Sequence, residues 1–147
     1  MVALRPLSIA HAELTAAIHR ASGALIPGYD VSLHSPAEDL EFHQTKVLVE
    51  NEAWGAFEGD ELVGFIAFQP GWIDHLYVHP DRLRRGIGSL LLTFAQHQQN
   101  ELRLYTFQSN TRGRAFYERH GFVIEELTDG ERNEEKMPDI TYLWYAD

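Results

Sequence analysis

The 147-residue sequence has no cysteine and few basic residues, and both shortages exclude functions. Without cysteine there is no disulfide framework, no thiolate nucleophile and no cysteine-ligated metal site. Only 12 lysines and arginines stand against 22 aspartates and glutamates, and the net charge of −10 argues against nucleic acid as a partner. No apolar run approaches the length of a membrane span, and the N-terminus has no signal-peptide core. We therefore expect a cytoplasmic protein without a nucleic-acid or membrane partner.

The residues that are present fit a single domain over 1–147, with an ordinary apolar fraction of 44%. Apolar runs and alternating patterns predict strands at residues 2–7, 47–57 (broken by Asn51-Glu52), 62–68, 72–78, 102–107, 122–127 and 139–145. Helical periodicity and capping residues predict helices near 10–21, 36–44, 87–99 and 110–120. This order predicts an α/β (α+β) fold, a mixed, mostly antiparallel sheet of about six to seven strands flanked by about four helices.

One stretch, residues 76–92, combines a strand end, a basic glycine-rich turn and a helix start. Gly86 and Gly88 allow a tight turn and a close approach of the backbone to a ligand. The free N–H groups and the positive dipole end of the following helix favour an anion, and Arg84 and Arg85 add charge beside it. The alternative is an ordinary strand-to-helix turn whose glycines serve packing.

The distribution of charge supports the anion site. Residues 1–81 carry a net charge of −9, residues 82–119 carry +5, and residues 120–147 carry −6. The only positive segment therefore begins beside the glycine-rich turn. Chance clustering of arginines on a solvated face is the competing interpretation.

A second constellation begins at Asn110, at the predicted start of a helix, and continues to Tyr117, two turns further on the same face. The Asn110 amide suits hydrogen bonding to a ligand, although a plain helix cap explains it too. For Tyr117 the competing interpretation is core packing.

These two motifs resemble those of the GNAT superfamily of acetyl-coenzyme A dependent N-acetyltransferases. The first is Leu-Tyr-Val-His-Pro at 76–80 followed by Arg-Arg-Gly-Ile-Gly-Ser at 84–89, and the second runs from Asn110 to Phe122. The resemblance implies that the backbone of the strand end holds the pantetheine arm, that the turn holds the pyrophosphate and that Asn110 contacts the cofactor. The cofactor-binding set implied is Leu76, Tyr77, Val78, Arg84, Arg85, Gly86, Ile87, Gly88, Ser89, Asn110 and Tyr117. The sequence departs from the family at Leu83, where Gln or Arg is usual, and we expect Arg82 or Arg84 to supply the missing charge.

The reaction implied is direct transfer of an acetyl group from acetyl-CoA to a primary amine in a ternary complex, without a metal. An alkylammonium, with a pKa of about 10, must lose a proton before it attacks. Asp74 and His75 are the candidate bases, and we favour Asp74, since alternation along a strand turns only one of them to the site unless a bulge intervenes. The resemblance makes Tyr117 the general acid for the leaving thiolate, and a backbone N–H at 76–78 is the simplest oxyanion donor.

The acceptor is less defined by the sequence. Five side chains are expected to line its pocket: Tyr29, Glu134, Glu135, Asp139 and Tyr142. Their acidity suits a cationic amine, from a small molecule or from a protein, while a solvated charged loop is the alternative for Glu134 and Glu135. Relatives that act on protein N-termini often have a glutamate five residues before the motif asparagine, where this chain has Tyr105. The resemblance leaves a homodimer open, and the alternative function is a non-catalytic acyl-coenzyme A binding module.

Overall fold

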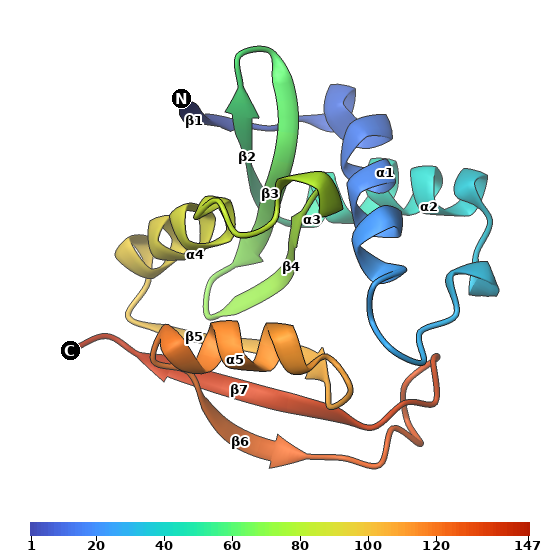
Figure 1. Cartoon of the computed structure of the whole chain (residues 1–147), viewed down its shortest axis with the longest axis vertical. Helices are drawn as coiled ribbons and strands as arrows, with labels where there is room; N and C mark the ends of the chain where they lie inside the picture. The colour runs from blue at the N-terminus through green and yellow to red at the C-terminus, as the bar shows by residue number, and fades with distance from the viewer.

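The computed structural model describes residues 1–147 and contains one seven-stranded sheet in the order β1-β2-β3-β4-β5-β7-β6 (Figure 1). The strands are β1 (Val2–Pro6), β2 (Glu52–Glu58), β3 (Glu61–Gln69), β4 (Trp72–Val78), β5 (Glu101–Phe107), β6 (Val123–Leu127) and β7 (Asp139–Tyr145). All neighbouring strands are antiparallel except β4 and β5, which are parallel. The predicted mixed, mostly antiparallel sheet is therefore confirmed.

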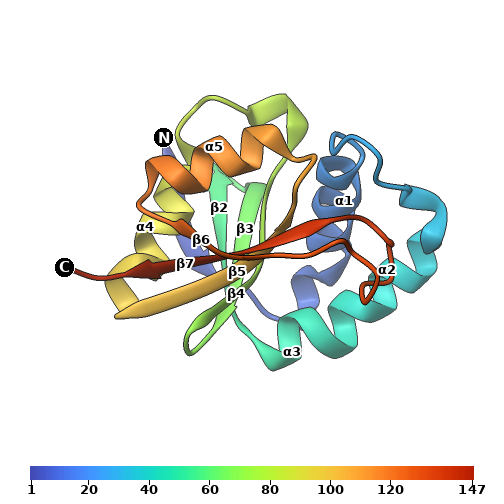
Figure 2. The same ribbon diagram turned by 90° about the horizontal axis from the view of Figure 1, so that it is seen from below.

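Helices cover both faces of the sheet (Figure 2). The helices are α1 (Ala12–Gly23), α2 (Pro36–Phe42), α3 (Leu48–Glu50), α4 (Ile87–Gln98) and α5 (Thr111–Arg119), with short 3₁₀ turns η1 (Ile9–His11), η2 (Val31–Leu33) and η4 (Pro80–Arg82) and a π-helix η3 (His43–Val47). One buried cluster joins α4 to the sheet, and a second joins α1 and η3 to its other face. None of the helices combines the length and apolarity needed to span a bilayer.

The predicted capping box at the start of α2 is present. The Ser35 hydroxyl accepts the Glu38 N–H at 3.1 Å, and the Glu38 carboxylate accepts the Ser35 N–H at 2.8 Å. Pro36 occupies the first turn, where a missing N–H costs nothing. This local signal fixes where the chain turns back toward the sheet after the loop that follows α1.

The predicted strand at 47–57 is wrong at its start, because β2 begins only at Glu52. The chain stays helical from Pro36 through η3 to Glu50. Val47 and Leu48 are buried against the α1 side of the sheet. Their burial in a tertiary core outweighs the β-propensity of the valines and leucine in this run.

The parallel pair β4 and β5 is joined only at one end. The single paired position is Trp72 with Arg103, at the first residue of β4. Beyond it the two strands diverge, whereas β3 stays paired with β4 as far as Val78. Backbone groups of Leu76–Val78 that point toward β5 therefore have no strand partner and are available to a ligand.

A β-bulge interrupts β4 at Asp74. Ala67 of β3 pairs with His75 and Phe68 pairs with Ile73, so Asp74 is the extra residue. The bulge reverses which face later residues occupy. Ile73 and Leu76 pack with the α4 cluster, whereas Tyr77 packs with the α1 cluster.

Candidate active site

A cleft of about 1850 Å³ opens where β4 and β5 diverge. It extends from the turn before α4 to the loops after α1 and β6. The cleft brings together these predicted residues: Asp74, His75, Leu76, Tyr77, Val78, Arg84, Gly86, Ile87, Gly88, Ser89, Asn110 and Tyr117. Among the predicted cofactor-binding and catalytic residues, Arg85 alone does not line the cleft, and it is exposed.

The turn before α4 has the backbone geometry of an anion site. Gly86 precedes the helix with φ 77°, and no side chain caps the first N–H groups of α4. A Cβ at Gly86 would meet nothing within 4 Å, so the glycine is required for its backbone conformation rather than for space. Arg84 has φ 64°, a conformation that costs a non-glycine residue free energy and that clusters at functional turns.

Arg82 does not supply charge to this turn. Its guanidinium donates to Glu58 at 2.9 Å and to Glu61 at 2.8 Å, and it ties η4 to the hairpin between β2 and β3. The expectation that Arg82 substitutes for the residue missing at Leu83 is therefore wrong. Arg84 and Arg85, which are exposed, remain the cations nearest the helix start.

Asn110 caps α5, as the structural alternative predicted. Its Oδ1 accepts the Gly113 N–H at 3.1 Å, and its Nδ2 donates to the Thr106 hydroxyl at 3.2 Å. A Cβ at position 113 would collide with the Asn110 side chain, so Gly113 makes room for the cap. The amide is held at the cleft wall, and a contact with a ligand remains a prediction.

Tyr117 is half-buried and lines the cleft from α5. Its ring packs on Phe116 and Phe122, with centroids 5.3 and 5.9 Å away. Burial raises the pKa of the Tyr117 hydroxyl above its ordinary value. The group therefore keeps its proton at neutral pH, as a general acid must.

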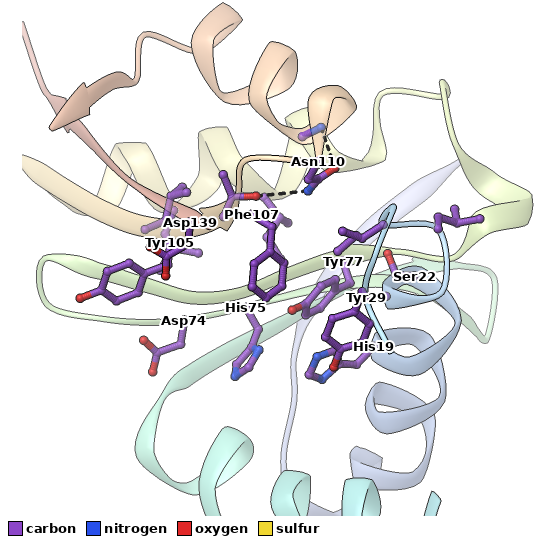
Figure 3. A pocket seen from close by; sticks show the side chains of 18 of the residues that line it. His19, Ser22, Tyr29, Asp74, His75, Tyr77, Tyr105, Phe107, Asn110 and Asp139 are labelled. Atoms are coloured by element: carbon purple, nitrogen blue, oxygen red, sulfur yellow. Dashed lines mark hydrogen bonds between the residues drawn. The ribbon is translucent and has the colours of Figure 1, made fainter. Parts of the chain in front are cut away.

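The bulge places both candidate bases on the cleft, which is the exception that the expectation from strand alternation allowed for. Figure 3 shows Asp74 and His75 leaving β4 on the same side. Asp74 is exposed and accepts a hydrogen bond from Gln69 Nε2 at 2.9 Å. His75 is largely buried, its Nδ1 has no partner, and burial lowers its pKa to about 4.

Two further histidines, which no sequence pattern indicated, lie beside His75. His43, from η3, is fully buried, and its Nε2 lies 3.0 Å from Nδ1 of His19 on α1. Nδ1 of His43 lies 2.8 Å from the hydroxyl of Thr15. His19 lines the cleft and stacks on Tyr77, with centroids 4.4 Å apart (Figure 3). Burial lowers the pKa of both His19 and His43 to about 3, so both rings are neutral at pH 7.

The three rings pack together, and His19 and His43 are also hydrogen-bonded to each other. No group of three or more His, Cys, Asp or Glu side chains is placed to hold a metal ion. His19, His43 and His75 lie with ring centroids 5.2 to 6.2 Å apart.

The far end of the cleft is acidic. Tyr29, Glu134, Glu135 and Asp139 line it, as expected. Tyr142 does not: it is fully buried, and its hydroxyl donates to Glu118 at 2.6 Å, because the register of β7 turns it toward α5.

Two loops meet over this acidic end. Nε2 of His34 lies 2.9 Å from the Glu134 carboxylate, which joins the segment after α1 to the loop between β6 and β7. The Ser109 hydroxyl donates to the carbonyl of Pro27 at 2.7 Å and ties the same segment to the start of α5. The loops thus form walls around the space next to Tyr29.

Solved structures share this fold over the whole chain. The apo form of YjaB from Escherichia coli superposes with a TM-score of 0.77 at 21% identity, covering 100% of this chain and 99% of that chain. The PaiA N-acetyltransferase of Thermoplasma acidophilum, solved in complex with coenzyme A, superposes with a TM-score of 0.74 at 24% identity, covering 99% of both chains. The chain therefore has the same fold as these two proteins.

Residues 49–124, more than half of the chain, match the family described as acetyltransferase (GNAT) domain. The chain belongs to this family. The peptidyl-lysine N-acetyltransferase YiaC of E. coli is 29% identical over 98 residues, 66% of each chain. The spermidine N(1)-acetyltransferase of T. acidophilum is 34% identical over 85 residues, 52% of each chain. The matched segments span about half to two thirds of the length of these relatives.

Proposed function

We propose that the chain is an N-acetyltransferase that transfers an acetyl group from acetyl-CoA directly to a cationic primary amine in a ternary complex. The observation that carries this proposal is the two-ended cleft. One end has an uncapped helix start beside exposed arginines, and the other has Tyr29 and carboxylates. The unpaired edge of β4 lies between these ends.

The residues present suit the co-substrate. The N–H groups at the start of α4 and the charge of Arg84 fit a pyrophosphate. The backbone edge of Leu76–Val78 fits the amide-bearing pantetheine arm, because it offers N–H and C=O groups without strand partners. Acetyl-CoA supplies the acetyl thioester at this point.

Side chains and backbone groups around β4 then promote the acetyl transfer. A backbone N–H of Leu76–Val78 stabilises the oxyanion that develops as the thioester carbonyl is attacked. Tyr117 donates its proton to the departing sulfur. The thiolate is a weak base, with a pKa of about 8.5 for the thiol, so this donation assists the reaction modestly.

The acceptor is proposed to carry positive charge in solution. Glu134, Glu135 and Asp139 provide negative charge at the mouth of the cleft. Two relatives are named for lysine side chains and for a polyamine, which are cationic amines. A small polyamine and a lysine side chain are therefore the first acceptors to test.

The test is a screen in which release of coenzyme A is followed with a set of amines. The set contains a polyamine, a lysine-containing peptide, a monoamine and a peptide with only an α-amino group. We expect release with the polyamine or the lysine peptide and acetylated amine in the product. Tight acetyl-CoA binding without release for any amine would instead favour a non-catalytic acyl-coenzyme A binding module.

A further inference from the structure

The hydroxyl of Thr15 and the rings of His43 and His19 form a continuous chain of hydrogen bonds that ends at the cleft. The Thr15 hydroxyl lies 3.2 Å from the carbonyl oxygen of Ala12 and 2.8 Å from His43 Nδ1. His43 Nε2 lies 3.0 Å from His19 Nδ1. His19 Nε2 has no partner within the chain, and the ring lines the cleft.

Only one arrangement of protons makes all three contacts hydrogen bonds. If the Thr15 hydroxyl donates to the Ala12 carbonyl, then His43 Nδ1–H donates to Thr15 and His19 Nδ1–H donates to His43 Nε2. The reverse arrangement starts with Thr15 donating to His43, and it loses the bond to Ala12. Buried polar groups favour the arrangement with more bonds satisfied. A neutral His19 then has its lone pair on Nε2.

We propose that His19 is the base that takes the proton from the acceptor amine and that Thr15 and His43 are positioning residues that fix its tautomer. This inference rests on the proposed function. It adds a catalytic role on α1, an element that neither sequence motif touches.

The fold holds the hydrogen-bonded chain of Thr15, His43 and His19 in place. His43 begins the π-helix η3, and wide helical turns of this kind are rare and frequent at functional sites. His43 is 0% exposed, as is Thr15. The His19 ring is fixed on its other side by stacking on Tyr77. A ring held from both sides cannot rotate to exchange its two nitrogens.

The alternatives for the base fit less well. Asp74 is exposed, and its carboxylate is already bonded to Gln69. His75 has a buried Nδ1 without a partner, so its single proton belongs on Nε2, which leaves no lone pair for the cleft. His19 therefore offers the better-defined lone pair.

The proton balance is simple. The cationic acceptor first loses one proton to solvent, which leaves a neutral amine with a lone pair for attack. As the new N–C bond then forms and the C–S bond breaks, the nitrogen gives its second proton to His19 Nε2, and the sulfur gains one from the Tyr117 hydroxyl. Solvent in the open cleft returns the proton from His19 to Tyr117. Burial keeps His19 unprotonated before the reaction, so it accepts the proton only while the nitrogen is becoming cationic.

The first experiment reads the tautomer directly in the free protein. Two-bond ¹H–¹⁵N correlation spectra distinguish protonated from unprotonated ring nitrogens, and they require no activity. We expect His19 to be protonated at Nδ1 and bare at Nε2. A proton on Nε2 of His19 in the wild type would overturn the inference.

The second experiment interrupts the hydrogen-bonded chain at Thr15 and leaves His19 unsubstituted. Thr15→Val keeps the shape but removes the hydroxyl, so His43 loses its acceptor and prefers Nε2–H, which forces the His19 proton to Nε2. We expect that switch in the spectrum, a fall in kcat of about tenfold or more, and an unchanged KM for acetyl-CoA. Thr15→Ser should restore the wild-type spectrum and rate. An unaltered spectrum and rate in Thr15→Val would contradict the positioning role.

The third experiment removes the base. His19→Gln can still donate to His43, and we expect kcat to fall by about 10²–10⁴-fold. His97→Gln, an exposed histidine on α4, is the matched control and should keep the wild-type rate. Wild-type kcat in His19→Gln would refute the role of His19, whereas wild-type protein inactive toward every amine would refute the proposed function, with the tautomer still readable by NMR.

Discussion

At the scale of single residues, Tyr117 combines a half-buried ring with a place on the cleft wall. Its raised pKa keeps the hydroxyl protonated through the neutral range. Tyr117→Phe should therefore lower kcat by about 10²-fold, the low end of the range for acid–base catalysis, because the thiolate is a good leaving group. The binding constant for acetyl-CoA, measured by calorimetry, should change little.

Tyr145→Phe is the control for this change, because Tyr145 is 60% exposed and lies outside the cleft. It should leave both kcat and binding unaltered. Full turnover in Tyr117→Phe would remove Tyr117 from the mechanism.

The place of a single residue could be predicted where it depends on a local motif. It could not be predicted where it depends on how distant segments pack. Asn110 and the capping box at Ser35 could be placed from sequence, since a cap involves residues within one turn. The contact between His19 and His43 joins positions 24 apart and depends on how α1 packs against η3. Tyr142 was misassigned because the face that a β7 residue occupies depends on register.

At the scale of elements, the turn into α4 is the feature with the sharpest expected effect. Gly86→Asp places a carboxylate where a phosphate is proposed to lie and forces a side chain into a positive-φ conformation. Acetyl-CoA affinity should fall by at least about 100-fold, near 2.7 kcal/mol. Calorimetry is the measurement.

Gly71→Asp is the matched control for the turn. Gly71 also has a positive φ and open space around it, but it lies in the turn between β3 and β4, outside the cleft. It should cost comparable stability without loss of binding. Equal acetyl-CoA affinity in wild type and Gly86→Asp would exclude this turn as the pyrophosphate site.

The two loops over the acidic end are expected to respond to pH. The hydrogen bond that His34 donates to the Glu134 carboxylate raises the pKa of His34 above its ordinary value of 6.5. The stabilising contact is therefore fully present below pH 6.5 and is lost as pH rises through the raised pKa. Hydrogen exchange in residues 128–138, corrected for intrinsic rates, should increase across that interval.

His34→Gln tests this contact, since glutamine keeps a donor but does not titrate. Its loop exchange, after the same correction, should show no step near neutral pH. A step of the same size in His34→Gln and wild type would show that another group controls the loop.

The bounds of most strands could be predicted from the sequence, whereas the irregularities in their pairing could not. The bounds of β4 and β7 match the predicted runs, since each is an apolar segment between turn residues. The bulge at Asp74 and the divergence of β4 from β5 have no local signature, because both depend on how neighbouring strands pair. The site depends on both the bulge and the divergence of the strands. Its two motifs could therefore be identified from the sequence, but its geometry could not.

At the scale of the whole molecule, the cleft is polarised. Exposed arginines lie at the turn before α4, and Glu134 and Glu135 lie at the opposite end. Glu134→Gln combined with Glu135→Gln should raise KM for a cationic amine several-fold. The increase should shrink at high salt, because exposed charges are screened over about 10 Å at 0.1 M.

KM for acetyl-CoA should not change in this double variant. Glu13→Gln combined with Asp60→Asn removes the same number of charges outside the cleft and should leave both KM values unaltered. Equal effects of the two double variants would attribute the change to net charge rather than to the acceptor end.

The central claim is that one cleft binds acetyl-CoA at the β4 edge and the α4 turn and keeps its acidic end for the amine. Hydrogen exchange with and without acetyl-CoA tests this most directly, residue by residue. We expect acetyl-CoA to protect residues 76–78 and 84–89 and to leave residues 128–138 unchanged until an amine is added. Protection of the acidic loop by acetyl-CoA alone, or none at the turn, would contradict it.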